Sequence, residues 1–151
     1  MADGSAQSRR EKIRQKTWRQ DTWRNVMRWI MAAFYIVAGV GHVLHPEPFL
    51  AIIPGWVPFP REVILLTGLC ELAGAAALLT TRLRAIAGIM LALYALCVWP
   101  ANIRHALDHI VLPPIPDTWW YHGPRLAFQP VLIWWALYCA GVIDWPWRRT
   151  Q

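Results

Sequence analysis

Four long apolar stretches follow one another along this chain, separated by segments rich in proline or in charge. Crossing the roughly 30 Å hydrocarbon core of a bilayer takes about 20 helical residues. The first stretch is short for this, but Arg28 next to it can extend the helix by reaching its charge to the interface. The pattern predicts an all-α integral membrane protein, a four-helix bundle over residues 29–147. The expected spans are about 29–44, 62–80, 85–101 and 125–143.

Proline-rich segments separate the first span from the second and the third from the fourth. Residues 45–60 contain five prolines. They cannot be helical throughout, because proline lacks the backbone N–H that a helix interior needs. Residues 102–123 contain three more, and we expect a second loop there. Pro100 is expected to bend or end the third helix. A short polar turn, TTRLR at residues 80–84, joins the second and third spans.

Residues 1–28 form a basic N-terminal arm. Trp18 and Trp23 lie among the basic residues of 9–28, a mixture typical of an interfacial helix that lies on a membrane surface. The basic region is too long for a secretory signal and no A-x-A cleavage site follows it, so we expect an uncleaved anchor. The arm is therefore predicted to contact anionic lipid or an acidic partner.

Composition agrees with a membrane protein. Hydrophobic residues make up 56% of the chain and charged residues only 16%, whereas about a quarter of a soluble domain is charged. There are 11 Trp, a residue enriched at membrane interfaces. The net charge of +6 does not indicate nucleic acid, because eight of the fifteen Lys and Arg residues lie in the arm. Cys70, Cys97 and Cys139 are isolated in apolar segments and are interpreted as small buried hydrophobic residues.

The distribution of basic residues predicts the orientation. Twelve lie in the arm, in the 80–84 turn and in the C-terminal tail, and three lie on the other side of the membrane: Arg61, Arg104 and Arg125. Because basic residues favour the cytoplasmic side, the expected protein is multi-pass in the bacterial inner membrane. Both termini would then be cytoplasmic, and the proline-rich loops would face outwards.

Glu71 lies in the middle of the apolar segment VILLTGLCELAGAAALLT, residues 63–80. At 1.5 Å of helix rise per residue it would lie roughly 13 Å below the outer surface. An acidic residue at such a depth costs about 2.5–3.5 kcal/mol, so it needs a partner or stays protonated. Its helical neighbours are small, and membrane helices pack closely along small faces. These neighbours, Thr67, Gly68, Gly74 and Ala75, predict that Glu71 points into the bundle.

The outer half of the bundle supplies candidate partners for Glu71, namely His42, Asn102, Arg125 and Gln129. By helix rise, Gln129 is closest to Glu71 in depth, and His42 would lie about 7 Å nearer the outer surface. Together the five residues predict a polar funnel that handles protons or binds a ligand. The alternative is a polar network that only fixes helix register. Trp134 and Trp135, midway along the fourth span, either pack in the bundle or stack on a bound ring.

All five histidines fall on the outer side. His105 and His109 are one helical turn apart, and His42 and His45 are three residues apart. This spacing is compatible with zinc or copper ligation. A metal site facing the periplasm, made by His42, His45, His105 and His109, is therefore a further hypothesis.

The order of several motifs resembles the DoxX-like family of small four-helix bacterial membrane proteins. The motifs are AGVGHVLHPEPFLAIIPGWVPFP, TGLCELAGAAALL, RLRAIAGIMLALYALCVWPANI and PRLAFQPVLIWWAL, within residues 30–140. The resemblance implies that the recurring polar and turn positions are His42, Pro54, Glu71, Asn102, Arg125 and Gln129. Some relatives are subunits of quinone-reducing sulfur oxidoreductases or partners of redox-stress enzymes. The basic arm and the extra histidines His105, His109 and His122 depart from the family.

Three functions follow as hypotheses. The first is a redox-associated membrane subunit that holds a lipophilic, quinone-like ligand, with Glu71 as its proton acceptor or hydrogen-bond partner. The second is an accessory subunit of a larger membrane complex, respiratory or photosynthetic, with no chemistry of its own, which contacts lipid and other membrane subunits. The third is the metal site. Since the sequence has no nucleophile triad, phosphate loop or redox CxxC, a subunit or partner is expected rather than a self-sufficient enzyme.

Overall fold

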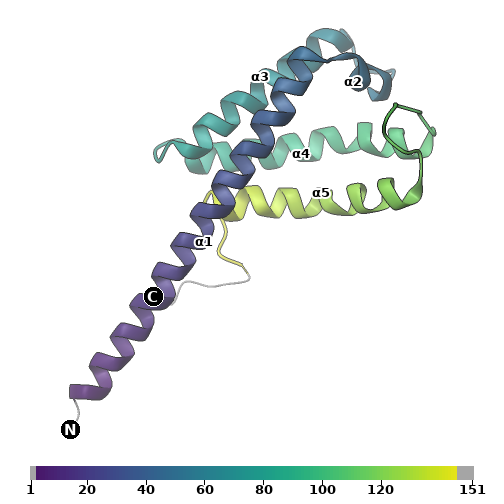
Figure 1. The fold of residues 1–151 in the computed structure, drawn as a ribbon. Coiled ribbons are helices and arrows are strands. Elements are labelled where there is room, and N and C mark those ends of the chain that lie inside the picture. Colours follow the sequence, from purple (N-terminus) through teal and green to yellow (C-terminus); the bar gives the residue numbers. More distant parts are fainter. Residues whose placement is uncertain (1–2, 146–151) are drawn as a thin grey trace.

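The computed structural model describes residues 3–145 of the chain, and this part is all-helical (Figure 1). The helices are α1 (Asp3–Leu44), α2 (Glu47–Ile52), α3 (Pro60–Leu79), α4 (Arg84–Leu107) and α5 (Trp119–Cys139). Within residues 3–145 the only β-type pairing is an isolated bridge between Leu112 and Ile115. The predicted all-α class is confirmed. Arg148 and Arg149, which contributed to the predicted orientation, lie outside the described residues.

Helix α1 runs without interruption over 42 residues, which corresponds to a length of about 63 Å. Its N-terminal part projects beyond the other helices (Figure 1). The structure therefore corrects the prediction of a separate interfacial helix over residues 9–28, because no break occurs between 28 and 29. The sequence gives a physical reason: no glycine or proline occurs between Gly4 and Gly39, so nothing interrupts the backbone hydrogen bonds.

Two helix boundaries differ clearly from the predicted ones, and one short helix was not predicted. Helix α4 continues through Pro100 to Leu107, and α5 begins at Trp119 with Pro124 and Pro130 inside it. The proline-rich segment 45–60 contains the short helix α2, whose prolines lie at its start, where the missing N–H has no intrahelical partner to lose. The extra turns of α4 are held by tertiary contacts. Arg104 donates to the Ile53 carbonyl, and His105 contacts Arg125.

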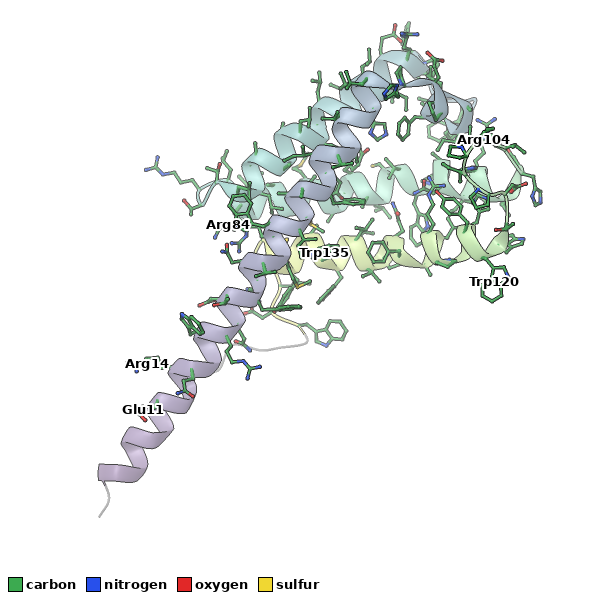
Figure 2. All side chains as sticks on the ribbon, viewed as in Figure 1. Glu11, Arg14, Arg84, Arg104, Trp120 and Trp135 are labelled. Atoms are coloured by element: carbon green, nitrogen blue, oxygen red, sulfur yellow. The ribbon has the colours of Figure 1, made fainter. Side chains whose placement is uncertain are left out.

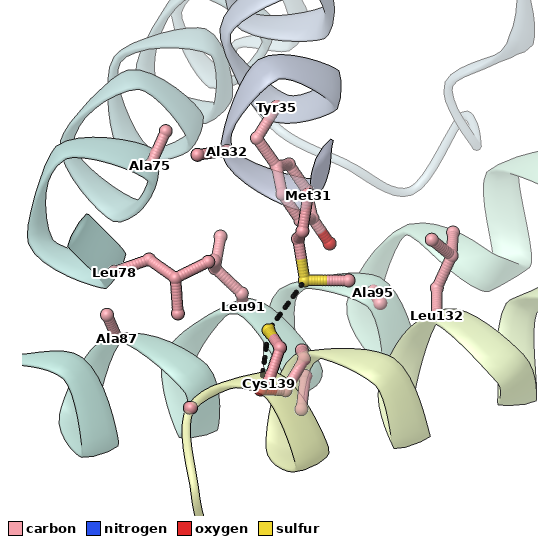
Figure 3. Packing of buried hydrophobic residues seen from close by; sticks show 13 residues of the cluster. Met31, Ala32, Tyr35, Ala75, Leu78, Ala87, Leu91, Ala95, Leu132 and Cys139 are labelled. Carbon is pink, nitrogen blue, oxygen red and sulfur yellow. Dashed lines mark hydrogen bonds between the residues drawn. The ribbon is translucent and has the colours of Figure 1, made fainter. Parts of the chain in front are cut away.

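The helices form two hairpins, α1 with α3 and α4 with α5, which pack together through α3 and α4 and through α1 and α5. The two hairpins lie close together near the α3–α4 turn and spread apart toward α2 (Figure 1). Small and medium side chains fill the close end. Figure 3 shows this core, where the Cys139 thiol lies 3.7 Å from the Met31 sulfur, beside Leu78, Leu91 and Ala32.

Three helical segments are long and apolar enough to cross a membrane, judged by length and composition: Trp18–Leu44, Pro60–Leu79 and Arg84–Leu107. Large apolar side chains on their outer faces are exposed, among them Val37, Leu66, Ile86 and Met90. Exposed apolar surface of this extent is unusual for a soluble monomer and typical of a lipid-facing surface. These features indicate a multi-pass membrane protein.

Candidate functional site

A cavity of about 480 Å³ lies between the two hairpins, on the side where they spread apart. This volume is in the range of small-molecule sites. All five residues of the predicted funnel line it, and Pro54 does as well. Its remaining wall is largely apolar and aromatic, with side chains from Phe34, Tyr35, Phe49, Trp56, Tyr94 and Phe128.

Glu71 and His42 form the polar part of the wall contributed by the α1/α3 hairpin. The Nδ1 atom of His42 lies 2.7 Å from Oε2 of Glu71, and the two side chains are only 12% and 4% exposed. The His42 ring packs on Phe49, with 3.8 Å between ring centroids. Tyr94, on α4, lines the same cavity as Glu71. The buried carboxylate thus points into the bundle and is bonded to His42 on α1, which satisfies the need of a buried acid for a partner.

Two glycines allow the close approach of α1 and α3 at which His42 reaches Glu71, while the amide of Gln129 is bonded to the Ala95 carbonyl. A Cβ atom added at Gly39 would lie 2.7 Å from the Gly68 carbonyl oxygen, and one added at Gly68 would lie 2.8 Å from the Cβ of His42. The α1 and α3 backbones therefore approach more closely than any side chain at these positions would allow. This contact brings His42 to Glu71 in spite of the 7 Å difference in depth expected from helix rise.

Arg125 forms the polar part of the opposite wall, on the α4/α5 hairpin. It donates to Oδ1 of Asn102 at 2.6 Å and contacts Nδ1 of His105 at 2.7 Å. Because arginine only donates, Nδ1 of His105 must accept, and the proton of that ring is on Nε2. Asn102 in turn donates to Gln129 over 3.4 Å, and Gln129 donates to the Ala95 carbonyl at 2.6 Å. In the described residues these hydrogen-bond partners of Arg125 are neutral, so its charge faces the cavity without a carboxylate bonded to it.

The histidines do not assemble into the predicted metal site. Within the part of the chain that the structure describes, no three His, Cys, Asp or Glu side chains are arranged to hold a metal ion. His42 is bonded to Glu71 and His105 to Arg125, while His109 lies 3.1 Å from Asp117 on the exterior. The one-turn spacing of His105 and His109 requires a helix through both residues, but α4 ends at Leu107 and His109 lies beyond it with a φ of 48°.

Trp134 and Trp135 do not line the cavity, and their contacts agree with the packing alternative and not with stacking on a ligand ring. Trp134 stacks on Tyr138 with 5.1 Å between ring centroids. The indole N–H of Trp135 donates to the Met27 carbonyl at 3.2 Å, where α1 passes α5 (Figure 2). Gln129 and Leu132 face the cavity from α5, and the two tryptophans lie beyond them toward the close end of the hairpins.

Sequence reasoning missed Tyr94 and Arg104, and it assigned His105 to a metal site and not to the support of Arg125. Tyr94 lies three residues after the buried Leu91, so its place on the inward face of the third span was readable from helical periodicity. Arg104 donates to the Ile53 carbonyl and pairs with Asp108. It thereby ties the end of α4 to the segment after α2.

No curated protein and no solved structure matches the chain. A family model described as a domain of unknown function, DUF8561, matches residues 31–140. The matched range contains every residue that lines the cavity and leaves out the basic arm. The chain belongs to the DUF8561 family.

Proposed function

We propose that this protein is a four-helix subunit of the bacterial inner membrane, with both termini cytoplasmic, that binds a flat lipophilic ligand with hydrogen-bonding oxygens. A quinone is the ligand class that fits this chemistry best. The resemblance of the motifs to the DoxX-like family, some members of which serve quinone-reducing enzymes, supports a redox-associated role.

The proposal counts α5 as the fourth span. Its 21 residues correspond to about 31 Å of helix. Its polar side chains His122 and Gln129 are turned inwards and are 2% and 3% exposed, while Val131 faces outwards. Polar groups that face the bundle interior do not contact lipid, so the mixed composition of α5 is compatible with a spanning helix.

The observation that carries the proposal is the pair of polar walls in one aromatic cavity. His42 and Glu71 come from the α1/α3 hairpin, and Arg125 and Asn102 from the α4/α5 hairpin. A ring with an oxygen on each side can be held from both hairpins at once, while its apolar body and tail contact the aromatic side chains.

His42 and Glu71 have complementary roles in this proposal. Glu71 occupies Nδ1 of His42, which leaves Nε2 as the nitrogen for a ligand oxygen. A carboxylate at one nitrogen sets the tautomer and the orientation of the ring. With Nδ1–H donating to Glu71, Nε2 of the neutral ring accepts a hydrogen bond or a proton from a hydroxyl oxygen of the reduced ligand. The protonated ring, with its charge offset by Glu71, instead donates from Nε2 to a carbonyl oxygen of the oxidised ligand. Arg125, fixed by Asn102 and His105, supplies positive charge to the other oxygen.

The test is binding of decyl-ubiquinone to the full chain in lipid nanodiscs, measured by isothermal titration calorimetry. Glu71→Gln retains the size and a hydrogen-bonding amide, so it is expected to fold normally and bind at least about tenfold more weakly, which corresponds to 1.4 kcal/mol. Glu62→Gln on the exposed start of α3 is the matched control and should bind like the natural protein. Absence of binding by the folded natural protein would overturn the quinone assignment.

A second candidate function is that of an accessory subunit without chemistry of its own. Trp120 and Trp56 at the outer end are 92% and 76% exposed, and exposed aromatic residues are enriched in protein interfaces. Purification in a mild detergent distinguishes the two functions. A stoichiometric membrane partner that is lost on Trp120→Ala, with binding of decyl-ubiquinone absent, would favour this candidate.

A further inference from the structure

A second hollow, of about 640 Å³, lies at the opposite end of the bundle from the cavity. It is formed by α1, by the α3–α4 turn and by the residues that follow α5. Its wall is polar and contains three arginines, Arg24, Arg28 and Arg84, and one acidic residue, Asp21. Figure 2 shows Arg84 at this end of the molecule and Arg104 at the other.

Arg24 and Arg28 are almost fully buried, with 3% and 8% of each residue exposed. Contacts with neighbouring groups hold both side chains in place. Arg28 donates to the Cys139 carbonyl through Nε at 3.0 Å and Nη2 at 2.8 Å, and to Oδ1 of Asn25 through Nη1 at 3.0 Å. Arg24 pairs with Asp144 and lies over the Tyr138 ring, 4.5 Å from its centroid. Two guanidinium groups are therefore pre-organised in the wall, and the bonds of Arg28 go to neutral oxygens.

Arg84 differs from the other two because its Nε is buried and has no hydrogen-bond partner within the described residues. It is the first residue of α4, and the residue before it, Leu83, provides no side-chain cap. The lining of the hollow holds three guanidinium groups but only one carboxylate, that of Asp21. The hollow thus combines surplus positive charge, a buried unpaired donor and an uncapped helix N-terminus, and each of these favours an anion.

We propose that this arginine pocket binds a phosphate group, with Arg84 as its principal contact and Arg28 as the second. The planar fork of arginine matches phosphate oxygens in a bidentate manner, and the first turn of α4 adds backbone N–H donors. The ligand is either the phosphodiester of an anionic lipid headgroup or free phosphate. With the termini in the cytoplasm, the pocket lies at the level of the anionic cytoplasmic leaflet, where basic pockets between helices bind lipid headgroups.

The experiment measures the unfolding temperature of the full-length protein in a neutral detergent after three separate additions: dioleoyl-phosphatidylglycerol, dioleoyl-phosphatidylcholine, or inorganic phosphate at constant ionic strength. We expect phosphatidylglycerol to raise the unfolding temperature by several degrees and phosphatidylcholine to have a much smaller effect. Stabilisation by phosphatidylglycerol alone identifies the lipid headgroup as the ligand. Stabilisation by inorganic phosphate as well identifies a site open to the free anion.

Arg84→Gln is the test variant, and Arg82→Gln, on the exposed turn two residues earlier, is its matched control. Since Nε of Arg84 has no partner to lose, Arg84→Gln should unfold at the same temperature as the natural protein or a higher one without additive, and should lose most of the shift. Arg82→Gln should retain it. Should Arg84→Gln be poorly folded, Arg84→Lys serves instead and should retain less than half of the shift. Equal shifts in the test and control variants, equal effects of the two lipids, or no shift at all would each overturn the proposal.

Discussion

Gly39 and Gly68 place the backbones of α1 and α3 in direct contact, since a Cβ atom at Gly39 would lie 2.7 Å from the carbonyl oxygen of Gly68. Each glycine is three residues from a member of the buried pair, His42 on α1 and Glu71 on α3. The hydrogen bond between those two side chains joins residues 29 positions apart. It depends on this close approach, because a wider helix separation would move the imidazole away from the carboxylate.

The first prediction concerns this contact. Gly39→Ala should destabilise the bundle, because the added methyl group meets the Gly68 carbonyl, and overpacking typically costs about 1–3 kcal/mol. Gly41→Ala on the same helix is the control, since only Phe49 lies near its added Cβ, at 4.0 Å. It should be neutral or stabilising, because alanine favours a helix over glycine by about 1 kcal/mol. Thermal unfolding in detergent compares them, and equal stability would contradict the close approach.

The second prediction concerns the buried pair itself. Removing one member, by His42→Ala or Glu71→Ala, should cost about 3–5 kcal/mol, because the other remains buried without its partner. The double variant should be less destabilised than the sum of the two. A double-mutant cycle measures this coupling, and the exposed pair of Arg61 and Glu47 is the control, with an expected coupling of about 0–1 kcal/mol. Additive effects at His42 and Glu71 would show that the contact contributes nothing.

The third prediction concerns Arg125. Its guanidinium contacts Asn102 and His105 at the same time, and lysine cannot reproduce this planar arrangement of donors. Arg125→Lys should therefore weaken binding of decyl-ubiquinone about tenfold, or 1.4 kcal/mol, although the positive charge is retained. Arg61→Lys, at an exposed position outside the cavity wall, should leave the affinity unchanged. Calorimetry in nanodiscs provides both values, and an Arg125→Lys protein with natural affinity would remove Arg125 from the site.

The sequence was sufficient to predict the long apolar helices and the inward direction of the Glu71 side chain, because both depend on local patterns. Apolar length indicates a helix in a membrane, and a face of small residues such as Gly68 indicates close packing. The identity of the partner was harder, since it depends on how α1 and α3 meet. The sequence left His42, Arg125 and Gln129 open as partners, with Gln129 closest in depth, and the structure has His42 bonded to the carboxylate beside the glycine contact.

The helix ends and the outer residues were predicted less well, because tertiary contacts outweigh local preference there. Pro100 would end an isolated helix, but Arg104 and His105 hold the following turn to other parts of the molecule. The orientation of Trp134 and Trp135 also depends on tertiary contacts. Their depth in the span was estimated from the chain, but the contacts that turn their rings toward Tyr138 and the Met27 carbonyl involve distant segments.

The fourth prediction concerns orientation. In a variant without the native cysteines, a cysteine at Thr118, in the exposed outer loop, should react with a membrane-impermeant maleimide added to intact cells. A cysteine at Arg82, in the exposed α3–α4 turn, should react only after the membrane is permeabilised. This follows from the excess of basic residues at the termini and in that turn. The reverse labelling pattern would place the arginine pocket on the periplasmic side.

The last prediction concerns the long helix α1. Two arginines connect α1 to the end of α5 and the residues after it. Arg24 pairs with Asp144, and Arg28 donates twice to the Cys139 carbonyl. Hydrogen bonds from a charged donor contribute about 1.5–3 kcal/mol each. Deletion of residues 2–28 should therefore destabilise the protein by about 3 kcal/mol or more, whereas deletion of residues 2–17 retains these contacts. The shorter deletion should leave the thermal unfolding temperature in detergent unchanged and reduce binding to anionic vesicles, because it removes five basic residues. If the shorter deletion unfolds the bundle, the N-terminal part of α1 is a structural element of the fold and not a membrane-binding extension.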